Sequence, residues 1–171
     1  MFYETVNINF TIDEYVSTDL YSINDNYSNG NYKINYYVDN NLLKTQYLKD
    51  GKLHRQDGPA MIEYKKNSKY KSSEIYCING TVHRDDGPAA IYYYNSEVKH
   101  FLYIEIYYIL GKPHNSKGPA RIYYDENGNV EREQYFINGE RIKFQKNIDN
   151  LNNDDIIKII NEYIWKSRRN E

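Results

Sequence analysis

Residues 51–60 read GKLHRQDGPA, and nearly the same phrase returns at residues 80–89 (GTVHRDDGPA) and 111–120 (GKPHNSKGPA). The second glycine of each phrase is residue 58, 87 and 118, so the copies lie 29 and then 31 residues apart. A shorter fourth copy begins at residue 138 with NGERI. A period of this size indicates a repeat architecture, in which each unit buries its apolar side against its neighbours. These stretches are called copies 1 to 4 below.

Each copy carries two turn signals. Asp-Gly or Asn-Gly opens three of the copies and favours a type I′ hairpin, because both central residues of that turn have positive φ. Copy 3 has Leu110 at this place, which suits the turn poorly. The Asp-Gly-Pro segment predicts a second turn, since Asp bonds its own backbone, Gly relaxes φ and Pro fixes it. With strands rich in Tyr and Ile on both sides, the sequence predicts a mainly β fold, an antiparallel β-meander of hairpin repeats.

Apolar residues alternate with other residues in the strand that follows each phrase, which places Ile and Tyr on one face. We expect this face to form the core, and the tyrosines of the preceding strands to stack in a parallel ladder. The expected core residues are Ile62, Tyr64, Ile91, Tyr93, Ile122 and Tyr124, and the expected ladder is Tyr47, Tyr76, Tyr107 and Tyr135.

The pattern Tyr-x-x-x-Gly-x-x-His-Arg-x-Asp-Gly-Pro-Ala-x-Ile resembles a repeat found in proteins of giant DNA viruses and some phages. It is similar, more distantly, to MORN repeats with their Tyr-x-x-Gly hairpins. The resemblance covers about residues 47–144. It implies a non-enzymatic scaffold for protein or lipid contacts, and a viral protein that acts on host or virion partners. Copy 3 departs from the pattern, because Asn115 replaces the Arg and Lys117 replaces the Asp.

The composition bounds the class of protein. The chain has 171 residues, the length of one domain, and a net charge of −2, so no basic field indicates nucleic acid or an acidic membrane as the partner. Its single cysteine, Cys77, excludes an internal disulfide framework and fits a reducing compartment. The first residues lack the features of a signal peptide. The apolar run 101–110 is far shorter than the ~20 residues of a spanning helix. We therefore expect a cytoplasmic protein without a membrane span.

The two ends differ from the repeats. We expect residues 1–44 to form an atypical N-terminal β cap, 45–146 to form about three and a half hairpin units, and 147–171 to form a C-terminal amphipathic helix, all in one compact domain. Asn152 or Asn153 is the expected N-cap, followed by acidic residues that complement the helix dipole. This helix is either a lid on the last hairpin or a partner-docking helix that faintly resembles the opening of an F-box-type motif.

Three histidines at the same position of copies 1 to 3 raise the question of whether they bind a metal ion. His54, His83 and His114 would lie roughly 10–14 Å apart across two or three strands, whereas zinc needs ligand nitrogens at ~2.1 Å. We therefore predict no metal and no cofactor. The favoured interpretation is that each His and Arg packs within its own turn, with Arg55 toward Asp57 and Arg84 toward Asp86. Cys77 lies within a strand, where a buried cysteine is usually a small hydrophobe.

Tyrosine is in excess, with 21 Tyr against 5 Phe and 1 Trp. Tyr suits sheet surfaces and contact patches alike, although an AT-rich genome would also explain the excess. Stacking on single-stranded nucleic acid would also need a positive groove. Glu63, Glu74 and Glu105 lie among the tyrosines, so nucleic acid ranks below a protein partner.

The sequence thus predicts a non-catalytic repeat scaffold that mediates protein–protein interaction. The alternative is a small-ligand-binding or hydrolytic protein with a pocket lined by Tyr, His and Arg. A deep polar cleft joining the His-Arg turns would favour this alternative. The candidate binding residues are Tyr92, Tyr94, Tyr108 and Tyr123, together with His54, Arg55, His83 and Arg84 of the turns.

Overall fold

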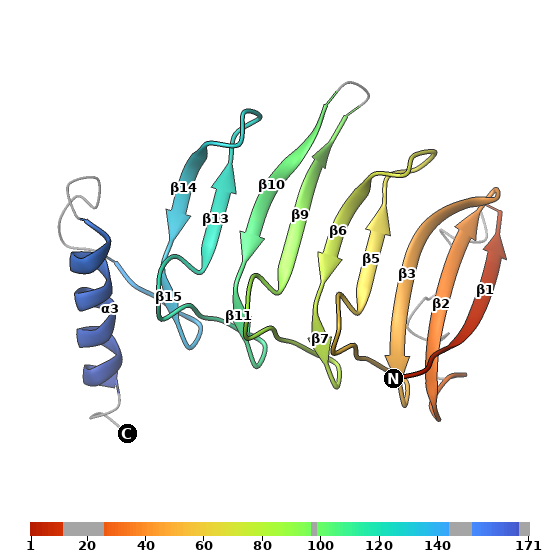
Figure 1. Cartoon of the computed structure of the whole chain (residues 1–171), viewed down its shortest axis with the longest axis horizontal. Helices are drawn as coiled ribbons and strands as arrows, with labels where there is room; N and C mark the ends of the chain where they lie inside the picture. Colours follow the sequence, from red (N-terminus) through yellow and green to blue (C-terminus); the bar gives the residue numbers. More distant parts are fainter. Residues whose placement is uncertain (12–25, 97–98, 144–151, 168–171) are drawn as a thin grey trace.

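The computed structural model describes residues 1–11, 26–96, 99–143 and 152–167. In this part the chain is mainly β with one helix, as the sequence predicts, and its long strands lie side by side in one sheet (Figure 1). The long strands are, in spatial order, β1 (Glu4–Phe10), β2 (Asn31–Val38), β3 (Asn41–Lys49), β5 (Met61–Tyr64), β6 (Lys71–Ile75), β9 (Ala90–Asn95), β10 (His100–Ile106), β13 (Arg121–Tyr124) and β14 (Val130–Gln134).

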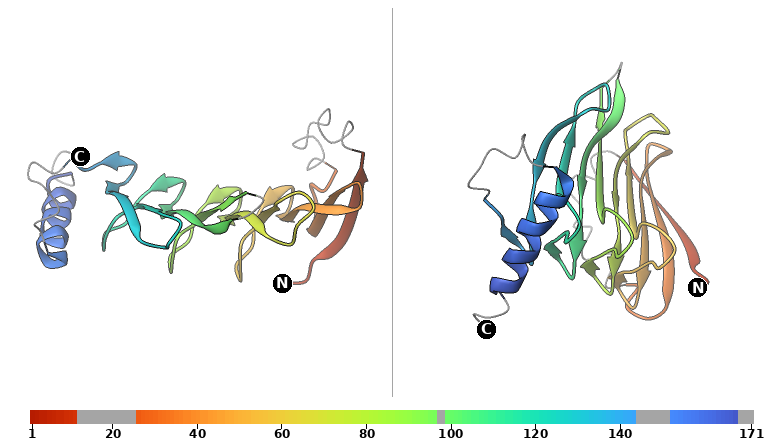
Figure 2. Two further views of the ribbon diagram at one scale, coloured as in Figure 1. Left: turned by 90° about the horizontal axis from the view of Figure 1, so that it is seen from above. Right: turned by 60° about the vertical axis from the view of Figure 1, so that its left-hand side comes forward.

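Short hairpins continue the long strands at one end of the sheet. Strand β1 pairs with β2 in parallel, and every other pair in the sheet is antiparallel. Figure 2 shows the successive hairpins in a single row along the long axis. The short strands are β4 (Lys52–Leu53), which pairs with β3, and the pairs β7 (Cys77–Ile78) with β8 (Thr81–Val82), β11 (Tyr108–Ile109) with β12 (Lys112–Pro113), and β15 (Phe136–Ile137) with β16 (Glu140–Arg141).

The hairpin turns have the backbone that the Asp-Gly and Asn-Gly signals predict. Both central residues have positive φ, for example 50° at Asn79 and 84° at Gly80. Copy 3 makes the same turn with φ of 49° at Leu110, although a leucine is strained in this left-handed region. The hairpin geometry is therefore common to all the copies, because the neighbouring strands impose it even where the local residue disfavours it.

Equivalent backbone hydrogen bonds join each hairpin to the next. The Gly80 N–H donates to Leu53 O at 2.8 Å, and the Gly111 N–H donates to Val82 O at 2.9 Å. The Gly139 N–H donates to Pro113 O at 2.9 Å, so the same bond recurs at all three junctions. The hairpins consequently form a continuous row, although each is only two strands wide.

The two faces of the sheet differ in chemistry. Cross-strand register places Ile62, Glu74, Ile91, Glu105, Ile122 and Glu133 in one row. We call this side the glutamate face. The adjacent row contains Met61, Ile75, Ala90 and Ile106, which alternation places on the opposite side, here called the apolar face.

The expected core is wrong in part. Ile62 is buried, but Tyr64, Ile91, Tyr93, Ile122 and Tyr124 are only half-buried. Glutamates alternate with these isoleucines along the same row, so the glutamate face cannot form a dry core. The buried clusters instead contain Ala60, Ile75, Cys77 and Ala90 in the repeats, and Ile34, Tyr36 and Leu48 in the N-terminal strands.

The helix α3 (Asn153–Ser167) packs on the last hairpin (Figure 1). Asn152 caps it, since its Oδ1 accepts from the Asp155 N–H at 2.9 Å. Ile156 and Ile160 of the helix are buried against Ile137 and Ile142. The contact agrees with the lid interpretation. Among the described residues, no helix combines the length and the apolar character that crossing a membrane requires.

The expected boundary between the N-terminal cap and the repeats does not coincide with the end of a strand. The expected division between residues 44 and 45 falls inside β3 (Asn41–Lys49). This strand starts before copy 1 and pairs with both β2 and β5. Expectations that concern residues 12–25 and 144–151 lie outside the described residues.

The strained turn of copy 3 gives a stability prediction. Leu110 is 72 % exposed and left-handed, so Leu110→Asn should raise the free energy of unfolding by about 0.5–1 kcal/mol, because an ordinary side chain loses roughly 1–2 kcal/mol in this region and Asn tolerates it. Urea unfolding would measure the gain. Leu110→Ala is the control, since it removes the exposed leucine without favouring positive φ. Equal stability of the two variants would contradict the prediction.

Candidate functional site

The His-Arg-x-Asp-Gly phrase builds a stacked unit in copies 1 and 2. The Arg55 Nε donates to Asp57 Oδ1 at 2.9 Å, and the Arg84 Nε donates to Asp86 Oδ1 at 2.7 Å. These hydrogen bonds hold the pKa of both carboxyl groups below their usual range. The expected Arg–Asp contacts are therefore confirmed.

The arginines also cover tyrosine rings. The Arg55 Cζ lies 4.0 Å from the centroid of Tyr47, and the Arg84 Cζ lies 4.1 Å from that of Tyr76. The expected ladder of tyrosine on tyrosine is thus wrong here, because the guanidinium takes the ring face. A cation over an aromatic ring contributes about 0.5–1 kcal/mol when exposed.

The glycine of Asp-Gly-Pro has a packing role. A Cβ placed on Gly58 would lie 3.0 Å from Arg55 Cζ, and a Cβ on Gly87 would lie 3.0 Å from Arg84 Cζ. Neither glycine has a left-handed φ. We expected these glycines to relax φ, but they are needed because they leave room for the guanidinium.

Copy 3 keeps the turn without the arginine. The Asn115 Nδ2 donates to Pro119 O at 2.9 Å, and its Oδ1 accepts from the Lys117 N–H at 2.9 Å. A Cβ on Gly118 would meet only Asn115 Nδ2, at 3.8 Å. The asparagine amide therefore bonds the backbone of its turn as the Arg84 guanidinium does in copy 2, where Nη1 donates to Pro88 O at 3.3 Å.

The Nδ1 atom of each histidine joins its copy to the next one, which corrects the expectation of bonding within the same turn, although the Nε2 of His83 does contact Asp85 of its own turn. The Nδ1 atoms of His54, His83 and His114 accept the backbone N–H of Asn79 at 3.1 Å, of Leu110 at 3.3 Å and of Asn138 at 3.1 Å. A ring whose Nδ1 accepts a hydrogen bond carries its proton on Nε2. Each histidine therefore holds the hairpin turn of the following copy.

The Nε2 atoms of the rings of His54 and His83 differ in their surroundings. The His83 Nε2 lies 3.4 Å from Asp85 Oδ2, whereas His54 is 4 % exposed and its Nε2 has no partner among the described residues.

In the part of the chain that the structure covers, no three His, Cys, Asp or Glu side chains gather in a group that could hold a metal. The Cys77 thiol is buried, and burial raises its pKa to about 11.

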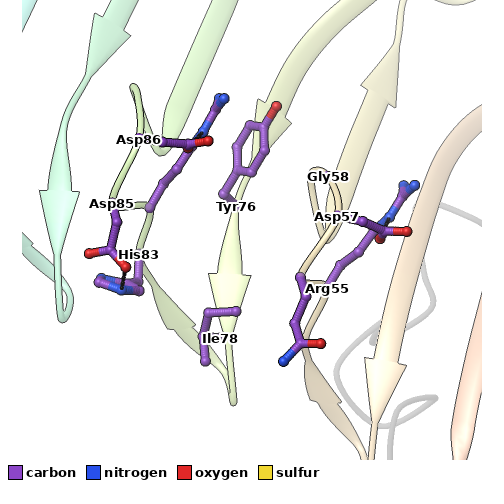
Figure 3. Close-up of a pocket in the computed structure, with 10 residues that line it drawn as sticks. Arg55, Asp57, Gly58, Tyr76, Ile78, His83, Asp85 and Asp86 are labelled. Carbon is purple, nitrogen blue, oxygen red and sulfur yellow. Dashed lines mark hydrogen bonds and ion pairs between the residues drawn. The ribbon is translucent and has the colours of Figure 1, made fainter. Parts of the chain in front are cut away.

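A polar groove of about 530 Å³ lies between copies 1 and 2. It brings together Arg55, His83 and Arg84 of the predicted turns, and leaves out the buried His54. Figure 3 shows Tyr76 between the Arg55–Asp57 pair and Asp86. An equivalent groove of about 420 Å³ lies between copies 2 and 3 and includes Tyr107 and Asn115.

Two of the four predicted contact tyrosines line a hollow. Tyr92 and Tyr108 line a hollow of about 360 Å³ with Met61, Ile75 and Val82. Tyr92 is 38 % exposed and Tyr94 is 46 % exposed. Tyr108 is half-buried against the apolar cluster.

Further aromatic residues extend this surface. Tyr123 is half-buried; its ring meets Tyr103 edge-on at 6.3 Å and lies under Arg132, whose Cζ is 3.8 Å from its centroid. Phe101 stacks on Tyr94 with 5.0 Å between centroids. Sequence reasoning missed Tyr103, because the register shifts between Leu102 and Ile104 and simple alternation fails there. Phe101 is brought to this surface by its cross-strand pairing with Tyr94, and this pairing is visible only in the structure.

Comparisons with known proteins found no match: neither a family model, nor a curated protein, nor a solved structure is similar to this chain. The candidate site is therefore described by its own geometry.

The two kinds of glycine give a matched pair of variants. Gly87→Ala should lower the free energy of unfolding by about 1–3 kcal/mol, since its new methyl group presses on the Arg84 guanidinium at 3.0 Å. Gly118→Ala should change stability by no more than about 0.5 kcal/mol, because its nearest neighbour is 3.8 Å away. Thermal unfolding of both variants measures the difference. Similar losses in both would show that the arginine is not what requires glycine.

The histidine bond gives a second pair. His54→Leu should destabilise the chain by about 1–3 kcal/mol, because the Asn79 N–H loses its acceptor in a part-buried place. His54→Asn should lose less, since its Oδ1 can occupy the place of Nδ1. Denaturant unfolding compares the two. If both variants lost the same free energy, the hydrogen bond would not be the contribution that matters.

Proposed function

We propose that the chain is a non-catalytic repeat scaffold that binds a protein partner through its apolar face. The observation that carries this proposal is the aromatic surface of Tyr92, Tyr94 and Tyr103, which are large side chains left 38–46 % exposed on adjacent strands. Tyrosine is enriched in protein interfaces, where its ring is buried and its hydroxyl finds a partner. The residues of the repeat phrase, in contrast, are already engaged in holding the copies together.

We also propose that the two ends of the chain close the row of repeats. Residues 45–146 act as the repeat array, the N-terminal strands cap one end, and α3 closes the other. The fourth copy supports this role of α3, because Ile142 stands at the position of the histidine. The Ile142 N–H donates to Tyr135 O at 2.9 Å, and the His114 N–H donates in the same way to Tyr107 O at 3.1 Å. An apolar residue thus takes the histidine's place where a helix, rather than another hairpin, packs on the unit.

A second candidate is a small-ligand-binding or hydrolytic protein that uses the groove between copies 1 and 2. The observation in its favour is that Arg55, His83 and Arg84 line one cavity of about 530 Å³. Against it, both arginines are bonded to aspartates and the His83 Nδ1 accepts a backbone N–H. These groups would have to exchange their present partners in order to act on a ligand.

The scaffold proposal is tested by removing two tyrosines of the apolar face. Tyr92→Ala with Tyr123→Ala should weaken capture of the partner at least about tenfold, because central aromatics often contribute 2 kcal/mol or more to an interface. The melting temperature should fall by only a few degrees, since Tyr92 is exposed and Tyr123 loses its contacts with Arg132 and Tyr103.

Affinity capture from a cell lysate, quantified by mass spectrometry, compares this variant with the unaltered protein. Tyr64→Ala is the control, because alternation places Tyr64 on the glutamate face. Equal capture by all three proteins would contradict the proposal, and unfolding of the double variant would mean that these tyrosines belong to the core.

A further inference from the structure

The hollow of about 360 Å³ on the apolar face combines apolar side chains with one carboxylate. It lies where the strands β5, β6 and β9 meet the short hairpins at their ends (Figure 1). Leu53, Met61, Ile75 and Val82 contribute to its apolar lining. Among the described residues that line it there is no Lys, Arg or His, so Glu63 gives the hollow a negative charge that no basic lining residue offsets.

The Glu63 carboxylate is held in place by a neighbouring strand. Glu63 pairs with Ser73 across β5 and β6, and Ser73 pairs with Tyr92 across β6 and β9. The Ser73 Oγ donates to Glu63 Oε2 at 2.8 Å. Among the described residues, Glu63 Oε1 has no hydrogen-bond partner. One carboxylate oxygen is thus fixed, and the other can accept from a group that enters the hollow.

Two tyrosine hydroxyl groups of the hollow are also open to a ligand. Those of Tyr92 and Tyr108 have no hydrogen-bond partner among the described residues, whereas those of Tyr93 and Tyr124 on the glutamate face each donate to a glutamate. Burial, then Tyr108 and then Glu63 raise the pKa of Tyr92, so these three polar groups lie near one another. The hollow therefore presents a cluster of oxygen acceptors beside an apolar floor.

A basic side chain near Glu63 leaves this cluster open. Lys44 pairs with Glu63 across β3 and β5, but it is 7 % exposed and does not line the hollow. Its Nζ lies 4.9 Å from the ring centroid of Tyr36, which belongs to β2 on the side of β3 away from β5. Burial lowers the pKa of Lys44, and Glu63 acts in the opposite direction. Lys44 thus weakens the field of Glu63 without forming an ion pair with it among the described residues.

We infer that this hollow receives a lysine side chain of the protein partner, with the ammonium group at Glu63, Tyr92 and Tyr108 and the aliphatic stem on the apolar floor. This inference rests on the proposed scaffold function and names the chemistry of the partner. Lysine buries its stem along apolar surface and carries its charge at the tip. The hollow has the same order of chemistry, with its apolar lining on one side and its acceptors on the other.

Lysine suits the acceptors of the hollow better than arginine does. An ammonium group has three N–H donors on a compact centre, which matches one carboxylate oxygen and two phenol oxygens. The guanidinium of arginine bonds a carboxylate best through both oxygens at once. Here such a contact would compete with Ser73, which already occupies Glu63 Oε2.

The experiment is a titration of the full chain with N-acetyl-lysine methylamide, followed by NMR of protein labelled on its tyrosine rings. The Tyr92 and Tyr108 signals should shift and saturate in the millimolar range, as expected for a single side chain. The Tyr93 and Tyr124 signals should stay, because their hydroxyls bond glutamates on the other face. Unmoved signals at Tyr92 and Tyr108 would overturn the inference, and so would equal shifts at all four rings, which would show a general attraction to carboxylates.

Two analogues of the probe separate the alternative occupants. The norleucine analogue has an aliphatic stem without the ammonium group and should bind at least about fivefold more weakly, because it makes no charge-assisted hydrogen bond. The arginine analogue should bind at least about threefold more weakly. If norleucine bound as well as lysine, the hollow would be a site for an apolar side chain. Tighter binding of arginine would likewise overturn the choice of lysine.

A matched pair of variants locates the charge. Glu63→Gln keeps an oxygen that can accept from Ser73, and should weaken binding of the lysine probe at least about fivefold while leaving the norleucine analogue unaffected. Glu105→Gln makes the same change of net charge on the glutamate face and should leave binding unaltered. A folded Glu63→Gln protein that bound lysine as the unaltered protein does would contradict the inference.

A third variant keeps the test valid if Glu63→Gln does not fold. Tyr108→Phe removes one hydroxyl group and keeps the ring against the apolar cluster, so the fold should persist. Binding of the lysine probe should weaken about twofold or more, because one neutral hydrogen bond is lost. Unchanged affinity would remove Tyr108 from the site and with it the proposed set of acceptors.

Failure of this inference and failure of the scaffold proposal are distinguishable. If the Tyr92→Ala and Tyr123→Ala protein loses its partner while the lysine titration shows nothing, the scaffold stands and the lysine site is overturned. If the titration saturates as expected but no partner depends on the apolar face, the hollow binds lysine and the proposed interface falls.

Discussion

The structure depends on the hydrogen bonds that join one short hairpin to the next. A two-stranded hairpin is marginal by itself in water, and each one here gains a backbone bond from the following turn and a histidine Nδ1 that accepts a second N–H of that turn. Because these bonds recur at each junction, the copies form one row and the long strands remain in register. The buried clusters are small and local, so the hydrogen bonds between copies contribute to the stability that a single large core provides in other domains.

This arrangement gives the most distinctive side chains of the sequence partners within the chain. His, Arg and Asp would suggest a catalytic set if they were read from sequence alone. In the fold, the histidine holds a turn, the aspartate holds the arginine, and the arginine covers a tyrosine ring with a glycine behind it. The exposed tyrosines Tyr92, Tyr94 and Tyr103, in contrast, lie outside the repeat phrase.

The two ends of the row show how a repeat structure is closed. Strand β1 pairs with β2 in parallel, unlike the other strands, so the first strands do not simply continue the meander. At the other end, α3 covers Ile137 and Ile142 of the last hairpin. An uncovered hairpin there would offer backbone groups and apolar side chains to other chains. The helix therefore covers apolar side chains of the fourth copy.

The sequence by itself determined the mainly β fold, the turns at Asp50, Asn79 and Asn138, the Arg–Asp pairs and the C-terminal helix. These features depend on residues close together in the chain, through φ preferences, side-chain reach and helical spacing. Only the tertiary structure decided the rest. It placed isoleucines in a row with glutamates, directed each histidine to the turn of the next copy, and brought Tyr103 against Tyr123 through a shift in register. Such contacts join residues more than ten positions apart, and the relative placement of strands that creates them is not encoded in any short stretch.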